Sequence, residues 1–242
     1  MKTIEIKNIE GKVLYSYICK DNNISKTLKQ ASIEQISLYK ANLSGQIIEN
    51  IKLSKLRLIE ANFTNSEFDN VIISDSYLNS TNLSCTKIKN THFVNTIFHN
   101  SNFVGSSIDN SQFLRCGLEH ALFCMSYIRN SEFKSIRMWN TNFIGARFNK
   151  VSYQDSIIKN THDVACIGNI GSRESYTTVF NTNKGILVSC GCFFGTLEEF
   201  KKEVLKTHKN SPTYKKEYLD MINYIQKRFK VKFSLKNIFK RK

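Results

Sequence analysis

Large apolar residues recur at every fifth position over half of the chain. The series runs from Leu43 to Ile158, and all 24 of its positions hold a large aliphatic or aromatic side chain. A period of five fits neither an α-helix nor a β-strand, whose side-chain periods are 3.6 and 2 residues. In most units a small residue stands two positions earlier, as Ala41, Ser66 and Thr91 do. Each unit of five therefore buries one large and one small side chain and exposes three.

A second period, of 20 residues, is superimposed on the first. Twenty residues are four units, which predicts a square coil of about six turns with like residues stacked between turns. Gly45, Gly105 and Gly145 fall at corners of one side, where a left-handed backbone is needed. Amides stacked between turns can bond to one another. Two asparagine series with this spacing are Asn42, Asn62, Asn82, Asn102 and Asn142, interrupted by Leu122, and Asn50, Asn70, Asn90, Asn110 and Asn130.

The repeated unit is similar to that of a known family. Ala41-Asn42-Leu43-Ser44-Gly45 and Ala61-Asn62-Phe63-Thr64-Asn65 resemble the Ala-(Asp/Asn)-Leu-x-x unit of pentapeptide-repeat proteins. The resemblance extends over residues 33–162 and implies a right-handed quadrilateral β-helix. A few units carry a larger residue in the small position, which predicts a locally wider bore; these are Ile51, Leu56, Val71, Ile136 and Val151.

The open ends of such a coil would expose backbone donors and an apolar bore, so both ends need a cap. Residues 3–8 and 12–18 alternate as two strands around Glu10-Gly11, which is a hairpin signal. Asn23 or Ser25 can then cap a short helix that reaches about residue 31. We expect an N-terminal cap at 1–40 and the β-helix at 41–162.

The five-residue register fails near Asp163, where we expect a second domain to begin. Residues 175–180 and 186–189 predict a hairpin. Thr196 and Glu199 form a capping box that opens a helix to about residue 207, and Ser211 with Pro212 opens another to about 229. These elements predict a small ββαα domain at 163–229, followed by a basic tail at 230–242.

Residues 165–229 resemble a C-terminal module of uncharacterised phage and prophage proteins. The resemblance rests on Ile170-Gly171-Ser172-Arg173, Cys190-Gly191-Cys192-Phe193-Phe194-Gly195, Thr207-His208 and Glu217-Tyr218. It implies a phage or prophage origin, and hence a cytoplasmic location in an infected or lysogenic bacterium. It implies no chemistry.

The net charge of +15 belongs mainly to the C-terminal third of the chain. No export signal stands at the start, and no apolar run approaches the roughly 18 residues of a membrane span. We therefore expect the seven cysteines to be reduced thiols rather than a disulfide framework. The near-neutral coil argues against imitation of DNA, an activity of some pentapeptide-repeat proteins that requires a strongly acidic surface.

The C-terminal domain carries a candidate pocket for an anion or small ligand. We expect it to be lined by Ser172, Arg173, His208, Tyr214 and Tyr218. The alternative is that Arg173 pairs with a helix carboxylate such as Glu217. A zinc site of Cys190, Cys192 and His208 with Cys166 or His162 is a further alternative. Because zinc normally takes Cys-x2–4-Cys spacing, we predict no metal and no cofactor.

The tail combines cations with aromatic residues, a composition typical of phosphate binding and base stacking. It also suits an anionic membrane surface, or a solvated extension without a ligand. The candidate phosphate contacts are Lys227, Arg228, Lys230, Lys232, Lys236, Lys240, Arg241 and Lys242.

Apolar residues also occupy outward positions of the coil that are normally polar. Such a surface predicts a docking face. It could receive the C-terminal domain, a second chain in a homodimer, or another macromolecule. The candidates are Val104 and Ile144 on one side, Val94 and Leu114 on a second, and Tyr77, Ile97 and Trp139 on a third.

No acid–base pair stands beside a plausible nucleophile, and we interpret His92, His99 and His120 as solvated surface residues. The sequence therefore predicts a non-catalytic protein, a rigid solenoid scaffold that engages a host or defence macromolecule. The alternative function is binding of nucleic acid or an anionic nucleotide through the basic C-terminal region.

Overall fold

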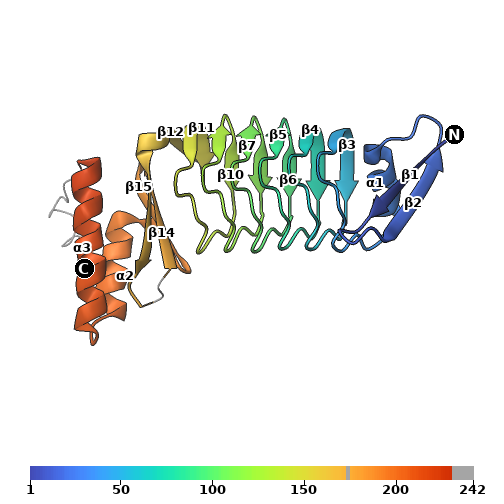
Figure 1. The fold of residues 1–242 in the computed structure, drawn as a ribbon. Coiled ribbons are helices and arrows are strands. Elements are labelled where there is room, and N and C mark those ends of the chain that lie inside the picture. The colour runs from blue at the N-terminus through green and yellow to red at the C-terminus, as the bar shows by residue number, and fades with distance from the viewer. Residues whose placement is uncertain (173–174, 231–242) are drawn as a thin grey trace.

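The computed structural model describes residues 1–172 and 175–230. A hairpin and helix, a long square coil, and a sheet with two helices follow one another in a row (Figure 1). No helix among the described residues has the length and apolar character needed to cross a membrane. Several predicted site residues lie outside the described residues; these are Arg173, Lys232, Lys236, Lys240, Arg241 and Lys242.

The coil has four faces, which we name by the buried residue at the centre of their units. Face A contains Leu43, face B Ile48, face C Leu53 and face D Leu58, and each series continues in steps of 20 residues. The predicted square coil is confirmed, with five steps of 20 residues on each face. On face D the first step joins Ser37 to Arg57 and the last joins Gly117 to Arg137, so the coil has about five turns and not six.

Faces B and C are built from parallel strands, whereas faces A and D are joined by isolated bridges such as Asn42↔Asn62 and Tyr77↔Ile97. The long strands β3, β4 and β11 turn the corner and serve both faces. The strands of the coil are β3 (Ile47–Ser54), β4 (Glu67–Ser74), β5 (Lys87–Lys89), β6 (His92–Val94), β7 (Ser107–Asp109), β8 (Gln112–Leu114), β9 (Tyr127–Arg129), β10 (Glu132–Lys134) and β11 (Arg147–Tyr153).

Every corner of the coil has a left-handed backbone. Each fifth residue from Gln35 to Asp155 has φ between 47° and 71°. Gly45, Gly105 and Gly145 have the expected left-handed backbone. All other corners have it as well, and asparagine is the commonest residue there. Asparagine tolerates this conformation better than other residues with a Cβ, which explains its enrichment there.

The bore is filled as the periodicity predicts. All 24 large residues from Leu43 to Ile158 are at most 5% exposed. Phenylalanines 20 residues apart stack face to face, as Phe113 does on Phe133, with ring centroids 4.8 Å apart. Four of the five larger residues in small positions are buried as well, and Ile51 is half-buried.

The N-terminal cap is the predicted hairpin and helix. Strands β1 (Lys2–Lys7) and β2 (Val13–Cys19) are antiparallel, and α1 spans Ile24–Ile33. The Asn23 side chain caps α1 by accepting a hydrogen bond from the backbone N–H of Lys26 at 2.9 Å. Ile6 and Leu28 belong to the same apolar core as the bore, so this cap closes the first rung.

At the other end the coil stops by reversing direction. Strand β12 (Ser156–Asn160) runs antiparallel to β11, so the unit around Ile158 folds back instead of continuing the coil. A short 3-10 helix, η1 (Thr161–Asp163), then leads into a four-stranded antiparallel sheet. It consists of β13 (Val164–Ile170), β14 (Ser175–Thr182), β15 (Gly185–Cys190) and β16 (Phe193–Thr196).

The predicted ββαα arrangement is therefore two strands short. Strands β13 and β16 carry Gly168 and Gly195 and are held by pairing with β14 and β15, so their strand character comes from tertiary structure. The helices α2 (Leu197–Thr207) and α3 (Pro212–Phe229) begin where the capping signals predicted. The sheet lies between the last rung of the coil and these helices (Figure 1).

Candidate functional site

Face D is the most unusual outer surface of the coil. Bridges Tyr77↔Ile97, Ile97↔Gly117 and Gly117↔Arg137 place four residues in one outward row. Tyr77 is 48% exposed and Ile97 is half-buried. Trp139, in the neighbouring outward row, is 44% exposed. The three predicted docking residues of this side therefore do share one face.

A buried carboxylate lies on the last rung but one of face D. The Glu119 residue is only 5% exposed, which is unusual for an acid on an outward row. The Arg137 Nε lies 3.0 Å from Glu119 Oε1, and the His99 Nε2 lies 2.6 Å from Glu119 Oε2. The His99 contact lacks the direction of a hydrogen bond, so His99 Nε2 and Glu119 Oε2 have no hydrogen-bond partner. Burying a carboxylate is costly unless it is paired, and the Arg137 guanidinium supplies the pairing.

Gly117 makes room for this arrangement. A Cβ at position 117 would stand 2.7 Å from His99 Nε2 and 2.9 Å from Glu119 Oε2. Gly117 is not among the residues with positive φ, so a Cβ here would not strain the backbone but would force the His99 and Glu119 side chains to shift. The sequence prediction missed Gly117, Glu119 and Arg137. Their signal is the 20-residue step that places Glu119 beside His99 and Gly117 between Ile97 and Arg137.

The histidines of the coil are less solvated than predicted, because each finds a different partner. The His120 ring packs edge-on against Trp139 with centroids 4.6 Å apart, and its Nδ1 lies 2.8 Å from Asn140 Nδ2. His92 Nδ1 lies 2.8 Å from Gln112 Oε1 on face C. His99 and His120 are both half-buried.

The other predicted docking residues do not belong to the same surface. Val94 and Leu114 are partners on face C, and both are half-buried. On face A, Val104 is half-buried and Ile144 is 47% exposed. The predicted set is therefore distributed over three faces, of which only face D combines exposed aromatic residues with a buried charge.

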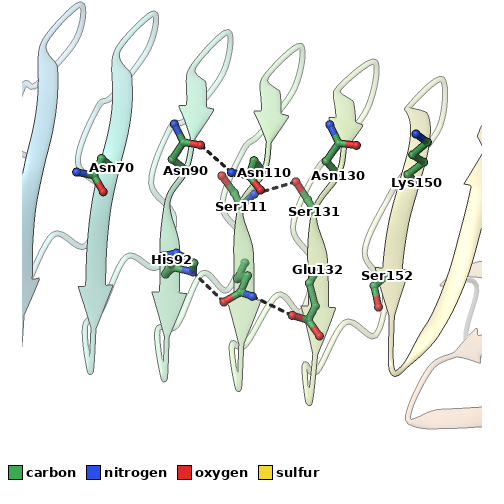
Figure 2. Close-up of a pocket in the computed structure, with 11 residues that line it drawn as sticks. Asn70, Asn90, His92, Asn110, Ser111, Asn130, Ser131, Glu132, Lys150 and Ser152 are labelled. Carbon is green, nitrogen blue, oxygen red and sulfur yellow. Dashed lines mark hydrogen bonds between the residues drawn. The ribbon is translucent and has the colours of Figure 1, made fainter.

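The corner between faces B and C forms a polar groove of about 520 Å³. Figure 2 shows its asparagines together with His92 and Glu132. Gln112 links these two, since its Oε1 lies 2.8 Å from His92 Nδ1 and its Nε2 donates to Glu132 Oε2 at 3.1 Å. The predicted asparagine ladder is only partly continuous. Asn110 donates to Asn90 at 2.8 Å, but Asn90 donates to Asp69 at 2.8 Å instead of to Asn70. These polar side chains satisfy one another, so the groove is a structural ladder.

The asparagines of the series that begins at Asn42 form hydrogen bonds mainly within their own turns. Asn62 Oδ1 accepts from the backbone N–H of Thr64 at 3.1 Å, and Asn102 Oδ1 accepts from that of Val104 at 2.9 Å. Contact between rungs occurs where Asn62 Nδ2 donates to Asn42 Oδ1 at 3.4 Å. Asparagine is thus selected here for local turns more than for stacking.

The structure brings three of the residues predicted for the C-terminal pocket around one hollow. Ser172, His208 and Tyr218 line a hollow of about 200 Å³, together with Cys190, Cys192 and Glu203. The His208 ring stacks on Tyr218 with centroids 5.1 Å apart. Tyr214 is not part of the lining, although its ring lies 6.0 Å from that of His208.

Two alternatives for this region can be compared with the structure. Glu217, the suggested partner of Arg173, accepts a hydrogen bond from the backbone N–H of Gly171 at 2.8 Å. Within residues 1–172 and 175–230, no group of three or more His, Cys, Asp and Glu side chains could hold a metal ion.

Three of the predicted phosphate contacts fall on described residues. Lys227 and Arg228 lie in the last turn of α3, and Lys230 is its left-handed C-cap. Arg228 donates to the backbone carbonyl of Val164 at 3.3 Å and lies over the Phe229 ring. Arg228 thus uses part of its hydrogen-bonding capacity for a contact within the domain.

Comparison with known proteins concerns the coil. The family described as pentapeptide repeats matches residues 36–75 with eight copies of its unit. No curated protein matches the chain. Solved structures with this fold include QnrB1, a plasmid-mediated fluoroquinolone resistance protein. It is 13% identical, with a TM-score of 0.31, and the alignment covers 47% of this chain and 84% of QnrB1.

Two cyanobacterial structures are similar as well. HetL from Nostoc sp. strain PCC 7120, a pentapeptide repeat protein involved in heterocyst differentiation regulation, is 16% identical with a TM-score of 0.26. Its alignment covers 46% of this chain and 52% of HetL. Rfr23 from Cyanothece 51142, another pentapeptide repeat protein, is 18% identical with a TM-score of 0.24, over 54% of this chain and 99% of Rfr23.

Proposed function

We propose that this protein is a rigid, non-catalytic scaffold that binds another protein through face D. The observation that supports the proposal is the surface around Gly117, where Tyr77 and Trp139 stand exposed on either side of the buried Glu119 and its partner Arg137. Tyrosine, tryptophan and arginine are the residues that contribute most to protein–protein binding.

The coil is suited to presenting such a surface at low entropic cost. Its outward side chains stand on a backbone whose rungs are hydrogen-bonded on all four faces. Binding to a preorganised surface requires little ordering of the protein itself, so more of the contact energy appears as affinity. The apolar rings gain roughly 25 cal/mol for each Å² that the partner removes from water.

The chemistry of face D favours a scaffold over an enzyme. His99 and Glu119 are an acid–base pair in contact, but the Arg137 guanidinium holds the carboxylate in an ion pair. Glu119 thereby anchors the position of Arg137, which is 67% exposed at the surface.

The resemblance of residues 165–229 to a phage module favours a partner from the host cell or its defence system. The alternative partner is nucleic acid or a nucleotide held by the basic C-terminal region. Lys227 and Lys230, at the end of α3, are cations of that region, so binding of nucleic acid is a second possible outcome of the test.

The test is capture of partners from host lysate, in parallel with and without nuclease, with the full-length protein, followed by titration of the purified partner. We expect Trp139→Ala to weaken binding by at least about 2 kcal/mol, and Tyr77→Asp to act in the same direction. Ile47→Asp, an exposed residue of face B, is the matched control and should bind as the wild type does.

Two results would contradict the proposal. One is a protein partner whose affinity is unchanged by both face D variants. The other is recovery of nucleic acid alone, lost when the chain is ended at residue 230, which would establish the alternative function.

A further inference from the structure

A second candidate surface lies where the coil meets the C-terminal domain. Two adjoining hollows, of about 870 and 400 Å³, share Gly145, Arg147, Thr161 and His162. The first opens over the last rungs of face B, and the second extends toward α3, which contributes Tyr224 and Arg228. Together they form one groove between β11 and the C-terminal sheet and helices, which we call the junction groove.

The junction groove carries positive charge without acids. Arg147 and Arg228 line it together with the His162 imidazole, and no Asp or Glu is among its described lining residues. Arg147 forms no ion pair within the described part of the chain, whereas Arg129, one rung earlier, binds Asp109 at 2.7 Å. The neighbouring Asp163 carboxylate is engaged by the Asn160 backbone and the Asn181 side chain. The groove therefore favours a negatively charged occupant.

The same groove exposes apolar side chains. Met125 is 75% exposed, Ile144 is 47% exposed and Tyr224 is 50% exposed. Met125 also occupies a left-handed corner, with φ 56°, between Gly105 and Gly145 on the same edge. Every other corner of the coil shares this backbone, so it is the exposure of Met125 that singles it out. Methionine is a flexible apolar side chain that suits binding surfaces.

We propose that the junction groove binds an acidic peptide segment with large apolar side chains, supplied by a partner protein. Acidic side chains would pair with Arg147 and Arg228, and apolar ones would cover Met125 and Ile144. A nucleic acid would use the cations and the tyrosine rings but would gain little from aliphatic side chains, so these residues favour the peptide. The groove is separate from face D, and the two proposals stand independently.

The experiment is selection of short random peptides by display on the full-length protein, followed by affinity measurement of the enriched peptides. We expect enrichment of Asp and Glu interspersed with Leu, Ile and Phe. Arg147→Glu and Met125→Asp should each weaken binding roughly tenfold or more. Trp139→Ala, on face D, should leave it unchanged, which separates this proposal from the proposed function.

Two matched variants control for charge and position. Lys87→Glu changes the same outward row of face B far from the groove, and Cys85→Asp changes the same left-handed edge as Met125. Both should bind the peptides as the wild type does. The proposal is overturned if no peptide is enriched, if the enriched peptides are not acidic, or if Arg147→Glu and Met125→Asp bind them normally. Binding of a single-stranded oligonucleotide that Arg147→Glu abolishes and Met125→Asp preserves would reassign the groove to nucleic acid.

Discussion

The presence or absence of a single Cβ atom affects which side chains can lie on the outer rows of the coil. At position 117 the missing Cβ allows His99 and Glu119 to lie over the backbone, and the bridge Gly117↔Arg137 places the arginine one rung further on. The neighbouring position 116 faces the opposite way, into the bore, where Cys116 is 1% exposed. Two adjacent residues of one rung thus face different surroundings: Gly117 lies beside the ionic groups of face D, and Cys116 lies in the apolar bore.

The thiol of Cys116 gives the interior a pH dependence. Burial raises the pKa of Cys116 to about 12, against an unfolded value near 8.5. The folded state therefore keeps a proton that the unfolded state loses, so this contribution to stability is complete below about pH 8.5 and declines as the pH rises toward 12. From pH 7 to pH 10 we expect the wild type to lose about 1.5–2 kcal/mol more unfolding free energy than Cys116→Ala.

Urea unfolding at several pH values measures this difference. Alanine fits the position, since Ala41, Ala61 and Ala121 occupy equivalent buried slots. The control is Cys85→Ala, whose thiol is exposed and should leave the wild-type slope unchanged. Parallel curves for the wild type and Cys116→Ala would show that the thiol is hydrated in the folded state.

At the scale of elements, each corner combines a backbone requirement with a side-chain bond. Asn110 has φ 47°, and its amide donates to Asn90 at 2.8 Å. The left-handed backbone penalises any residue with a Cβ, and asparagine suffers least of these. The amide bond adds a modest stabilisation of about 1 kcal/mol.

Two substitutions at Asn110 separate these contributions. Asn110→Ala loses the amide bond and keeps a Cβ in the left-handed region, so we expect a loss of about 1–2 kcal/mol. Asn110→Gly loses the same bond but relieves the backbone, so we expect less than half of that loss. Urea unfolding gives both values, with Ser107→Ala in strand β7 of the same rung as control. Equal losses for the two variants would mean that the backbone conformation contributes nothing.

The coil could be predicted from the sequence because its buried positions repeat at a fixed period. The elements that were missed are held in place by pairing with neighbouring strands. The coil was predictable because each unit from Leu43 to Ile158 solves the same packing problem. Helices α2 and α3 were predictable from local caps, such as the reciprocal pair of Thr196 and Glu199. Strands β13 and β16 have no such local signal. Periodicity also places His99 beside Glu119, but it does not tell which way their side chains turn, so the ionic centre of face D was missed.

At the scale of the whole molecule, the bore needs a lid at each end. Phe180 of β14 is 1% exposed and supplies the lid at the C-terminal end. Its ring lies 4.6 Å from that of Tyr153 and 6.3 Å from that of Phe143, centroid to centroid. The opposite face of the sheet packs Val179 and Val188 against the two helices. The C-terminal domain is therefore a structural cap as well as a wall of the junction groove.

Phe180→Ala tests how far the influence of this lid reaches along the coil. We expect a loss of about 3–5 kcal/mol where the ring is removed. In a repeat protein each rung contacts only its neighbours. Backbone hydrogen exchange should therefore accelerate in β11 and around Phe143, while β3 and β4 at the far end keep their protection.

Leu28→Ala, in the N-terminal cap, is the matched variant and should loosen β3 instead. If either variant accelerated exchange equally along the whole coil, the rungs would form one cooperative unit. The distance over which exchange accelerates then measures the coupling between rungs. It also determines whether a partner bound at the junction groove can alter the stability of face D, since Trp139 and Glu119 lie on the last two rungs of that face before the coil reverses.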